Sequence, residues 1–481
     1  MSDAESTLPS GSSGPTNAPS AIPPTPPVAP RAAGPRGPQR RRRHIGLATL
    51  VIIVVVIVVA GGVLGYLYVE KKLPGQSSSI GGCSKSTAIT VWQDFSATEF
   101  PAFSKAVGEY EAANPGQSVN WVNETTPSPS NYVAAALACQ APDVLIGTSD
   151  FAGGLYFDGF LANLSRYLPA SAFSSFISSA MADVTQNGAV YGFPLNVNGV
   201  AMIYNKKLVA TPPNTTNQMI SLAKNITVTS GGKITVAGLV YGVDSDGGYR
   251  YPAWQAGFGG QMFNPNGTPD LNTPASVYAL EFLNNFSTVD KIEPPGVTTE
   301  STYQDLFAQG DAGMIFDGPW NIDMYLNALG HGNVGVAPIP IVSQTGLHPR
   351  PLWGSIGAFV SLPNASGASS TLFNESIKFS QFLASPAVES ELFNSSGDIP
   401  SIASTFSYVE SLNISFENGF LQQFFQYSQP FPNTPQMTYF WDPYATEVSS
   451  YVSGSISAQA AMNGIQSSMV SEMQQNHIPP Y

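Results

Sequence analysis

The feature that most constrains this chain is a 24-residue run without a charged side chain, Ile45–Tyr68 (IGLATLVIIVVVIVVAGGVLGYLY). A helix rises 1.5 Å per residue, so the run would reach about 36 Å, enough for the ~30 Å hydrocarbon core of a bilayer. It is apolar on every face, which is rare for a buried helix of this length in a soluble protein. The run therefore predicts a single transmembrane helix, and the sequence contains no second run of spanning length.

The flanks of this run predict the side of the membrane on which each part lies. Arg40–Arg43 and His44 precede it, whereas Glu70, Lys71 and Lys72 follow it. Because basic residues stay on the cytoplasmic side, we expect residues 1–44 to form a cytoplasmic tail with a basic cluster. The tail lacks large apolar side chains and is expected to be disordered. Residues 69–84 then form a linker at the cell membrane, and the rest is extracellular. Cleavage at Gly46-Leu47 by a prepilin-type peptidase is the alternative to a retained span.

The composition of the external part excludes several classes of partner. Residues 73–481 contain 11 Lys+Arg against 29 Asp+Glu. A nucleic-acid partner is disfavoured because phosphate binding requires basic patches. Three His and three Arg in this part also disfavour a metal or an anionic ligand. So few basic residues limit the positive charge that remains once carboxylates are protonated, which suggests an acidic medium.

Asn-X-Ser/Thr sequons are frequent in the external part, which favours a glycoprotein over an effect of composition alone. They begin at Asn123, Asn163, Asn214, Asn225, Asn266, Asn285, Asn364, Asn374, Asn394 and Asn413.

The two cysteines, Cys83 and Cys139, both fall in the external part. Cys83 precedes the first expected strand, and Cys139 ends a helical stretch that leads into another strand. If those strands are neighbours in one parallel sheet, both thiols lie at the same edge. A disulfide closing this loop could contribute about 4 kcal/mol. Two small buried residues are the alternative interpretation.

Short apolar strands alternate with helical patterns after the linker. Strands are expected at Ala88–Trp92, Val119–Val122 and Asp143–Gly147, with helices at Glu99–Asn114 and Tyr132–Cys139 between them. This alternation predicts an α/β fold with a parallel, doubly wound sheet. Ligands of such sheets bind beyond the carboxyl ends of the strands. The residues to inspect are therefore Gln93–Ser96, which include Asp94, and Thr148–Phe151, which include Asp150. Further helices are expected at Ala275–Phe286, Thr302–Ala308, Trp320–Leu329, Leu372–Ala384 and Ala445–Gln475.

Five collinear segments after the linker carry a specific resemblance. They are YGFPLNVNGVAMIYNKKL at 191–208, PDVLIGTSDFAGGLYFDGFLANL at 142–164, FAQGDAGMIFDGPW at 307–320, the FL.S…G..P pattern within 377–400, and TPQMTYFW at 434–441. Together they resemble the maltose/maltodextrin-type sugar-binding family of ABC importers, in its archaeal, membrane-anchored form. One such motif would carry little weight, but five in the same order are specific.

The resemblance implies a two-lobed periplasmic-binding-protein-like fold of type II, in which the lobes close on a ligand like a hinged clamp. One lobe would comprise 85–196 with 356–405, and the other 199–353 with 411–481. The connections between them would be Asn196–Gly199, Leu352–Ser355 and a third near Ser404–Ser411. The implied partners are a carbohydrate and the permease subunits of an ABC transporter with their cytoplasmic ATPase. No cofactor and no metal is implied.

The resemblance also assigns ligand contacts residue by residue. Asp150 falls on a hydroxyl-binding Asp, and Asn198 stands where a relative carries a carboxylate. Trp320 and Trp441 fall on two aromatic stacking positions; Tyr249 lies near a third, with Trp254 as a competing candidate. Gly147 replaces an aromatic residue, and Phe151 a basic one, which argues against maltose itself while leaving the sugar class intact.

The chemistry of these residues agrees with a neutral, polar ligand. A pyranose has an apolar face that packs on aromatic rings and a rim of hydroxyls that bonds with carboxylates and amides. A cell-surface glycoside hydrolase would need a second carboxyl beside Asp150. Asn198 stands where such an acid would be most useful, and Gly-X-Ser-X-Gly and HExxH motifs are absent from the sequence. The same fold with a peptide or a polyol as its ligand is the other alternative.

Overall fold

The computed structural model describes residues 87–479, except 124–128, 244–245, 298 and 413. The predicted tail, the predicted span Ile45–Tyr68 and Cys83 lie outside the described residues. Among the helices that are described, none has the length and apolar character needed to cross a membrane.

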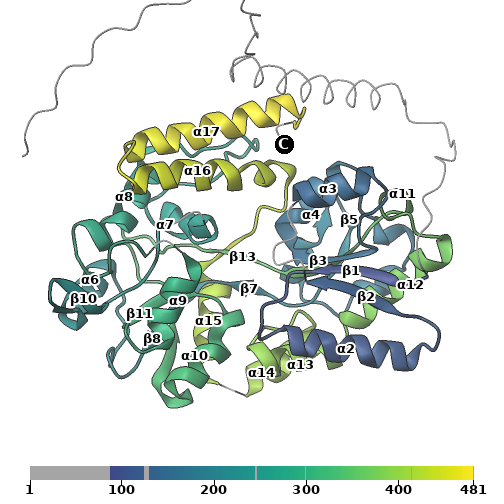
Figure 1. The fold of residues 1–481 in the computed structure, drawn as a ribbon, viewed down its shortest axis with the longest axis horizontal. Helices are drawn as coiled ribbons and strands as arrows, with labels where there is room; N and C mark the ends of the chain where they lie inside the picture. The colour runs from purple at the N-terminus through teal and green to yellow at the C-terminus, as the bar shows by residue number, and fades with distance from the viewer. Residues whose placement is uncertain (1–86, 124–128, 244–245, 298, 413, 480–481) are drawn as a thin grey trace, which may run out of the picture. The chain divides into compact units, whose positions relative to one another are not determined.

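The first lobe is built on a five-stranded sheet with the order β2-β1-β3-β14-β6 (Figure 1). Strand β1 (Ile89–Gln93) pairs in parallel with β2 (Val119–Asn123) and β3 (Val144–Thr148). The connections are α2 (Phe100–Ala113) and α3 (Pro129–Leu137), so the predicted βαβαβ unit is confirmed to within a few residues. Strand β14 (Ile356–Val360) then inserts antiparallel between β3 and β6 (Gly192–Pro194).

The second lobe is built on a three-stranded sheet in which both pairings are antiparallel. Strand β8 (Ala201–Asn205) lies between β11 (Met314–Asp317) and β12 (Val334–Ala337). The prediction of a parallel sheet is therefore right for the first three strands but does not extend to this lobe. The helix α15 (Ser415–Tyr427) packs on β12 so closely that a Cβ on Gly419 would lie 2.4 Å from the carbonyl oxygen of Val336.

A narrow ribbon of three short strands joins the lobes. Strand β13 (Leu352–Gly354) pairs antiparallel with β7 (Asn198–Gly199) and parallel with β15 (Gln429–Pro430). Figure 1 shows β7 and β13 running between the two groups of elements. The first two predicted connections coincide with β7 and β13. The third, Ser404–Ser411, lies within the helix α14 (Ala403–Ser411), which leads into α15 of the second lobe, and it stays a prediction; β15 is the third strand of the ribbon.

The remaining helices cover the two sheets. Those of the first lobe are α4 (Ser149–Phe157), α11 (Pro363–Ser366), α12 (Ser370–Leu383) and α13 (Pro386–Ser396), with α5 (Ser178–Asp183) near the ribbon. Those of the second are α6 (Thr216–Ile226), α7 (Tyr251–Gly257), α8 (Pro274–Thr288), α9 (Glu300–Ala308) and α10 (Ile322–Leu329).

The C-terminal helical stretch predicted as Ala445–Gln475 is two helices, α16 (Trp441–Val452) and α17 (Ala458–Gln475). Gly454 adopts a φ of +77° after α16, and the Ser457 side chain accepts a hydrogen bond from the Ala460 N–H to start α17. The turn lets α17 fold back along α16, and both helices pack on the core of the second lobe. The residue limits predicted for the two lobes stay a prediction.

Candidate functional site

Two of the predicted polar residues follow neighbouring strands of the first lobe. Asp94 comes directly after β1, and Asp150 lies in the first turn of α4, after β3. Burial, followed by repulsion from Asp150, raises the pKa of Asp94 from 3.8 to about 7. The structure therefore brings these two carboxyls into one electrostatic environment, as the strand-end argument predicts.

Asp150 is bound by an indole from the far end of the chain. Trp441, the first residue of α16, donates its Nε1–H to Asp150 Oδ2 at 3.1 Å. Asp150 is 4% exposed, so this hydrogen bond forms largely out of water. The bond joins the first lobe to a helix whose core contacts belong to the second.

Four aromatic side chains follow one another from this indole, and we call them the aromatic row: Trp441, Phe431, Tyr249 and Trp320. The ring centroids of Phe431 and Trp441 are 6.1 Å apart, and those of Tyr249 and Phe431 are 5.7 Å apart with nearly parallel planes (16°). Tyr249 and Trp320 are separated by 6.2 Å. The row thus combines three residues that the sequence predicts with Phe431, which it does not.

Phe431 was missed because nothing in its own neighbourhood marks it. It follows β15 in a Pro-rich segment, and its backbone N–H donates to the carbonyl of Trp353 on β13. The segment that resembles the sugar-binding family starts only at Thr434, three residues later. The pairing of β15 with the ribbon, which is a long-range contact, places the ring between Tyr249 and Trp441.

Trp320 is held by the short helical turn that contains it, η4 (Pro319–Asn321). Its ring lies over Gly318, where an added Cβ would come within 2.0 Å of the indole carbons. Its backbone carbonyl accepts a hydrogen bond from Thr98 Oγ1 of the first lobe at 2.7 Å. The side chain position therefore depends on Gly318, and the backbone is bonded to the opposite lobe.

Tyr249 is fixed at its phenol end, where its hydroxyl donates to the carbonyl of Leu352 on β13 at 3.1 Å. Burial, followed by the charges of Asp150 and Asp183, raises the pKa of Tyr249, so the phenol stays protonated. The neighbouring Arg250 points elsewhere: its guanidinium lies 4.2 Å from the ring centroid of Tyr303 and 5.0 Å from that of Tyr241.

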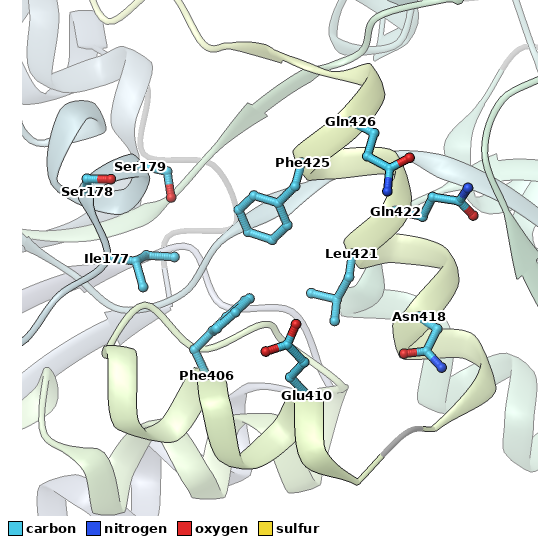
Figure 2. A pocket seen from close by; sticks show the side chains of 10 residues that line it. All are labelled: Ile177, Ser178, Ser179, Phe406, Glu410, Asn418, Leu421, Gln422, Phe425 and Gln426. Carbon is cyan, nitrogen blue, oxygen red and sulfur yellow. The ribbon is translucent and has the colours of Figure 1, made fainter.

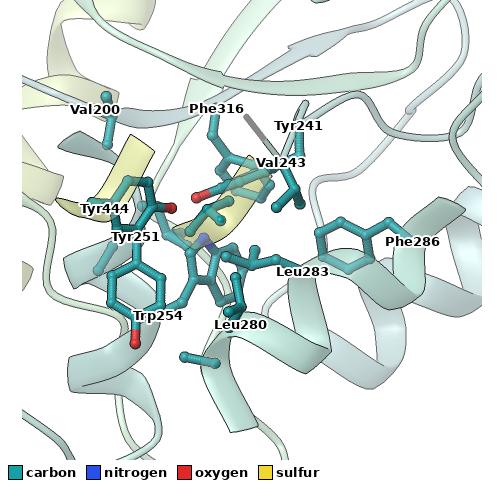
Figure 3. Close-up of a cluster of buried hydrophobic side chains, with 14 of the residues drawn as sticks. Val200, Tyr241, Val243, Tyr251, Trp254, Leu280, Leu283, Phe286, Phe316 and Tyr444 are labelled. Carbon is teal, nitrogen blue, oxygen red and sulfur yellow. The ribbon is translucent and has the colours of Figure 1, made fainter. Parts of the chain in front are cut away.

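Trp254 does not belong to the site, and its prediction as a ligand contact is corrected. The residue is 1% exposed, and its ring centroid lies 5.1 Å from that of Phe282 and 5.2 Å from that of Phe316. Figure 3 shows it among the apolar side chains of the second lobe's core. Five residues beyond Tyr249, the helix α7 directs this ring inward instead of toward the row.

Asn198 is engaged by other protein groups. It lies in β7 and is 8% exposed. In the amide orientation that satisfies both of its ends, the nitrogen donates to Asp398 Oδ1 at 3.3 Å and the oxygen accepts from Asn196 Nδ2 at 3.1 Å. Asn198 therefore takes part in the polar packing at the ribbon, and its contact with a ligand stays a prediction. Gly147 lies within β3, and Phe151 within α4.

A pocket of about 620 Å³ is separate from these residues (Figure 2). It lies between the start of α5 and the helices α14 and α15, and contains none of the predicted ligand contacts. Its lining residues are Ile177, Ser178, Ser179, Phe406, Glu410, Asn418, Leu421, Gln422, Phe425 and Gln426. Among the described residues, no group of three or more His, Cys, Asp or Glu could hold a metal ion.

Cys139 ends the turn after α3 and is disulfide-bonded. The only other cysteine of the sequence, Cys83, lies outside the described residues. The predicted pairing of the two stays a prediction.

The comparisons with known proteins agree with one another. A model of the bacterial extracellular solute-binding protein family matches residues 105–408. The maltotriose-binding protein of Pyrococcus abyssi is 26% identical over 357 residues, covering 73% of this chain and 75% of that protein. The maltooligosaccharide ABC transporter solute-binding lipoprotein of Streptococcus pneumoniae is 29% identical over 331 residues, covering 67% of this chain and 74% of that protein.

Solved structures show the same similarity in three dimensions. The maltose/maltodextrin-binding domain of Bdellovibrio bacteriovorus bound to maltotriose superimposes with a TM-score of 0.74 at 26% identity, covering 80% of this chain and all of that domain. The maltotriose-binding protein of Thermus thermophilus gives 0.69 at 23% identity, covering 80% of this chain and 100% of that chain, and supports the fold alone.

Proposed function

Since the chain belongs to the bacterial extracellular solute-binding protein family, we propose that it captures a maltooligosaccharide-like sugar outside the cell and delivers it to the permease of an ABC transporter. The observation that carries the proposal is the aromatic row beside Asp150 and Asp94. The names of the relatives support the class of ligand, because they include maltotriose- and maltooligosaccharide-binding proteins.

The row and the carboxyls have the chemistry that such a ligand requires. Successive rings 5.7–6.2 Å apart offer apolar surfaces for more than one sugar unit. Asp150 and Asp94 at the strand ends offer hydrogen bonds to the hydroxyl rim. A hydroxyl that binds Asp150 would take over the role of the Trp441 N–H, so the indole is free to turn toward a sugar face. Trp320 and Trp441 then act as stacking platforms, with Tyr249 and Phe431 between them.

The proposal includes a membrane anchor, which rests on the sequence alone. The predicted helix Ile45–Tyr68 would hold the binding domain at the outer face of the cell membrane, within reach of the permease. Residues 69–84 would form the tether. The sequons that lie on exposed positions, such as Asn214, Asn266 and Asn374, support an extracellular glycoprotein.

One observation favours a second function. Asp94 and Asp150 are close enough to interact, and the pKa of Asp94 is raised to about 7. A glycoside hydrolase also uses two carboxyl groups, one of them with a raised pKa. The relatives argue for the binding function, since they are named as binding proteins. Incubation with maltotriose and a reducing-end assay separates the two: steady release of smaller sugars would refute the receptor.

Calorimetric titration of the full-length protein with maltotriose tests the proposal directly. We expect saturable binding that Trp320→Ala weakens by roughly ten- to a hundredfold, about 1–3 kcal/mol. Trp121→Ala is the matched control, since Trp121 lies on β2, packs on Phe100 and is 38% exposed. Equal losses in both variants, or no binding of maltotriose and longer maltodextrins by the wild type, would contradict the proposed site.

A further inference from the structure

Three carboxyl groups are buried where the two lobes meet behind the ribbon. Glu99 precedes α2 in the first lobe, Asp398 lies in the turn after α13, and Glu417 lies in the first turn of α15. Each is 1% exposed. We call these three residues the carboxyl cluster.

The cluster draws its members from both lobes. Glu99 belongs to the helix that follows β1, whereas α15 packs on β12 of the second sheet. The turn that carries Asp398 touches the second lobe as well, because a Cβ on Gly397 would lie 2.5 Å from Ile322 Cγ2. The next residue, Ile399, accepts a hydrogen bond from the Val197 N–H at 2.7 Å, in the connection that leads to β7. A movement of one lobe relative to the other would therefore separate Glu417 from Glu99 and Asp398.

Donors are distributed unevenly over the members. Asp398 accepts from Asn196 Nδ2 at 3.0 Å, from the Asn198 amide at 3.3 Å and from the Ser396 side chain. Glu99 Oε2 accepts from the Ser96 N–H at 2.6 Å. Glu99 Oε1 and both carboxyl oxygens of Glu417 have no hydrogen-bond partner in the described structure. The Glu99 and Asp398 carboxyls nevertheless lie within hydrogen-bonding reach of one another. Two ionised carboxylates repel, so this contact requires a proton between them.

The charges around the cluster do not compensate it. Burial raises the pKa of each member. For Glu99 and Glu417, repulsion from Asp398 raises the pKa further, and the pKa of Glu417 reaches about 8. On the packed elements, Glu389 of α13 is bound by the Ser401 N–H and the Ile402 N–H. Asp317, before η4, accepts hydrogen bonds from Asn321 Nδ2 and the Tyr325 hydroxyl. Burial raises the pKa of Asp317, and the positive charge of Arg250 opposes this effect. Lys105 of α2 pairs with Glu391 on the surface.

We propose that the carboxyl cluster is a proton-operated latch between the lobes, which holds them together when it is protonated and releases them when it ionises. In the latched state, one proton joins Glu99 to Asp398 and a second keeps Glu417 neutral. Loss of these protons would bring buried like charges together, with that of Glu417 lacking a hydrogen-bond donor, which is costly unless the cluster opens to water. The closed form thus binds protons more tightly than the open form, and by linkage protons favour the closed form.

The latch can be tested without any sugar, so its failure would leave the proposed function untouched. Spin-labelled non-canonical residues at the exposed positions Ser104 of α2 and Ser221 of α6 would report the distance between the lobes in the full-length protein. We expect the short-distance population to shrink between pH 4.5 and pH 8. For each proton released, the ratio of closed to open molecules should fall about tenfold per unit of difference between that group's pKa in the closed form and in the open form. Distance distributions that are the same at both pH values would overturn the latch.

Neutral isosteres separate the latch from a general effect of pH. The variant Asp398→Asn with Glu417→Gln should keep the short-distance population at pH 8, because its amides cannot ionise. Glu417→Gln alone, which changes the side chain least, should show the same trend if the double variant does not fold. Glu410→Gln, at an exposed position of α14, is the matched control and should respond as the wild type does. A Glu417→Gln variant that opens with pH as fully as the wild type would also overturn the proposal.

Discussion

Trp441 donates its indole N–H to the carboxylate of Asp150 across 291 residues of sequence. The bond joins the start of α16 to the start of α4, and therefore couples the position of one stacking ring to the strand-end carboxyl. Both residues are predicted ligand contacts. These two groups therefore satisfy each other in the structure, and under the proposed function a sugar would have to exchange with their bond.

Replacing Trp441 with Phe separates the ring from its hydrogen bond. The aromatic row keeps a ring at this place, but Asp150 loses one charge-assisted donor. We expect the free energy of unfolding without sugar to fall by about 1.5–3 kcal/mol, measured by chemical denaturation. Trp121→Phe is the control and should change it by less than about 0.5 kcal/mol. Equal stability of Trp441→Phe and the wild type would show that the bond does not contribute.

Gly318→Ala should displace Trp320 without altering the ring itself. The backbone φ of Gly318 is −104°, which any residue adopts, but the added Cβ would lie 2.0 Å from the indole. The ring has to move, and maltotriose affinity should fall roughly ten- to a hundredfold in calorimetric titrations. Gly332→Ala, where an added Cβ has no heavy atom within 4 Å, should leave the affinity unchanged. A normal affinity for Gly318→Ala would exclude Trp320 as a platform.

Asp94 should make the protein less stable as the pH rises. Its pKa is raised from 3.8 to about 7 by burial and by Asp150, so between those values the folded state holds a proton that the unfolded state has lost. The contribution of Asp94 to stability is therefore fully present below about pH 4 and is lost as the pH approaches 7.

Melting temperatures recorded from pH 4 to pH 8 check this sign. Asp94→Asn cannot ionise, so its decline over this range should be shallower than that of the wild type. Asp305→Asn, at an exposed position of α9, should follow the wild type. A steeper decline for Asp94→Asn would refute the assignment of a raised pKa.

Trp254→Ala should affect folding and not recognition. The side chain is buried against Phe282 and Phe316, so its truncation should cost about 3–5 kcal/mol of stability. The variant that remains folded should bind maltotriose with the wild-type affinity, because the ring lies outside the aromatic row. A selective loss of affinity at unchanged melting temperature would return Trp254 to the site.

Local patterns were sufficient for the elements whose partners are close in sequence. Strands β1, β2 and β3 are short and are separated by single helices. Strands joined by such a helical crossover normally pair in parallel, as these do, and normally have a right-handed connection. The same reasoning placed Asp94 and Asp150 at one edge of the sheet. Motifs preserved over the length of the chain predicted Trp320, Trp441 and Tyr249, because each lies in or near a segment that resembles the family.

The remaining parts of the site depend on contacts between distant segments. The insertion of β14 beside β3, the third strand of the ribbon at Gln429–Pro430 and the place of Phe431 in the row arise from pairings that no local periodicity encodes. Whether an aromatic side chain lines the site or the core, as Tyr249 and Trp254 show, depends on the direction in which α7 begins. The apolar run, the parallel βαβαβ unit and the class of ligand follow from sequence, because they rest on composition, local period and collinear motifs. Tertiary structure decided which side chains meet, because packing and hydrogen bonding between segments hundreds of residues apart select among aromatic residues that look equivalent in the sequence.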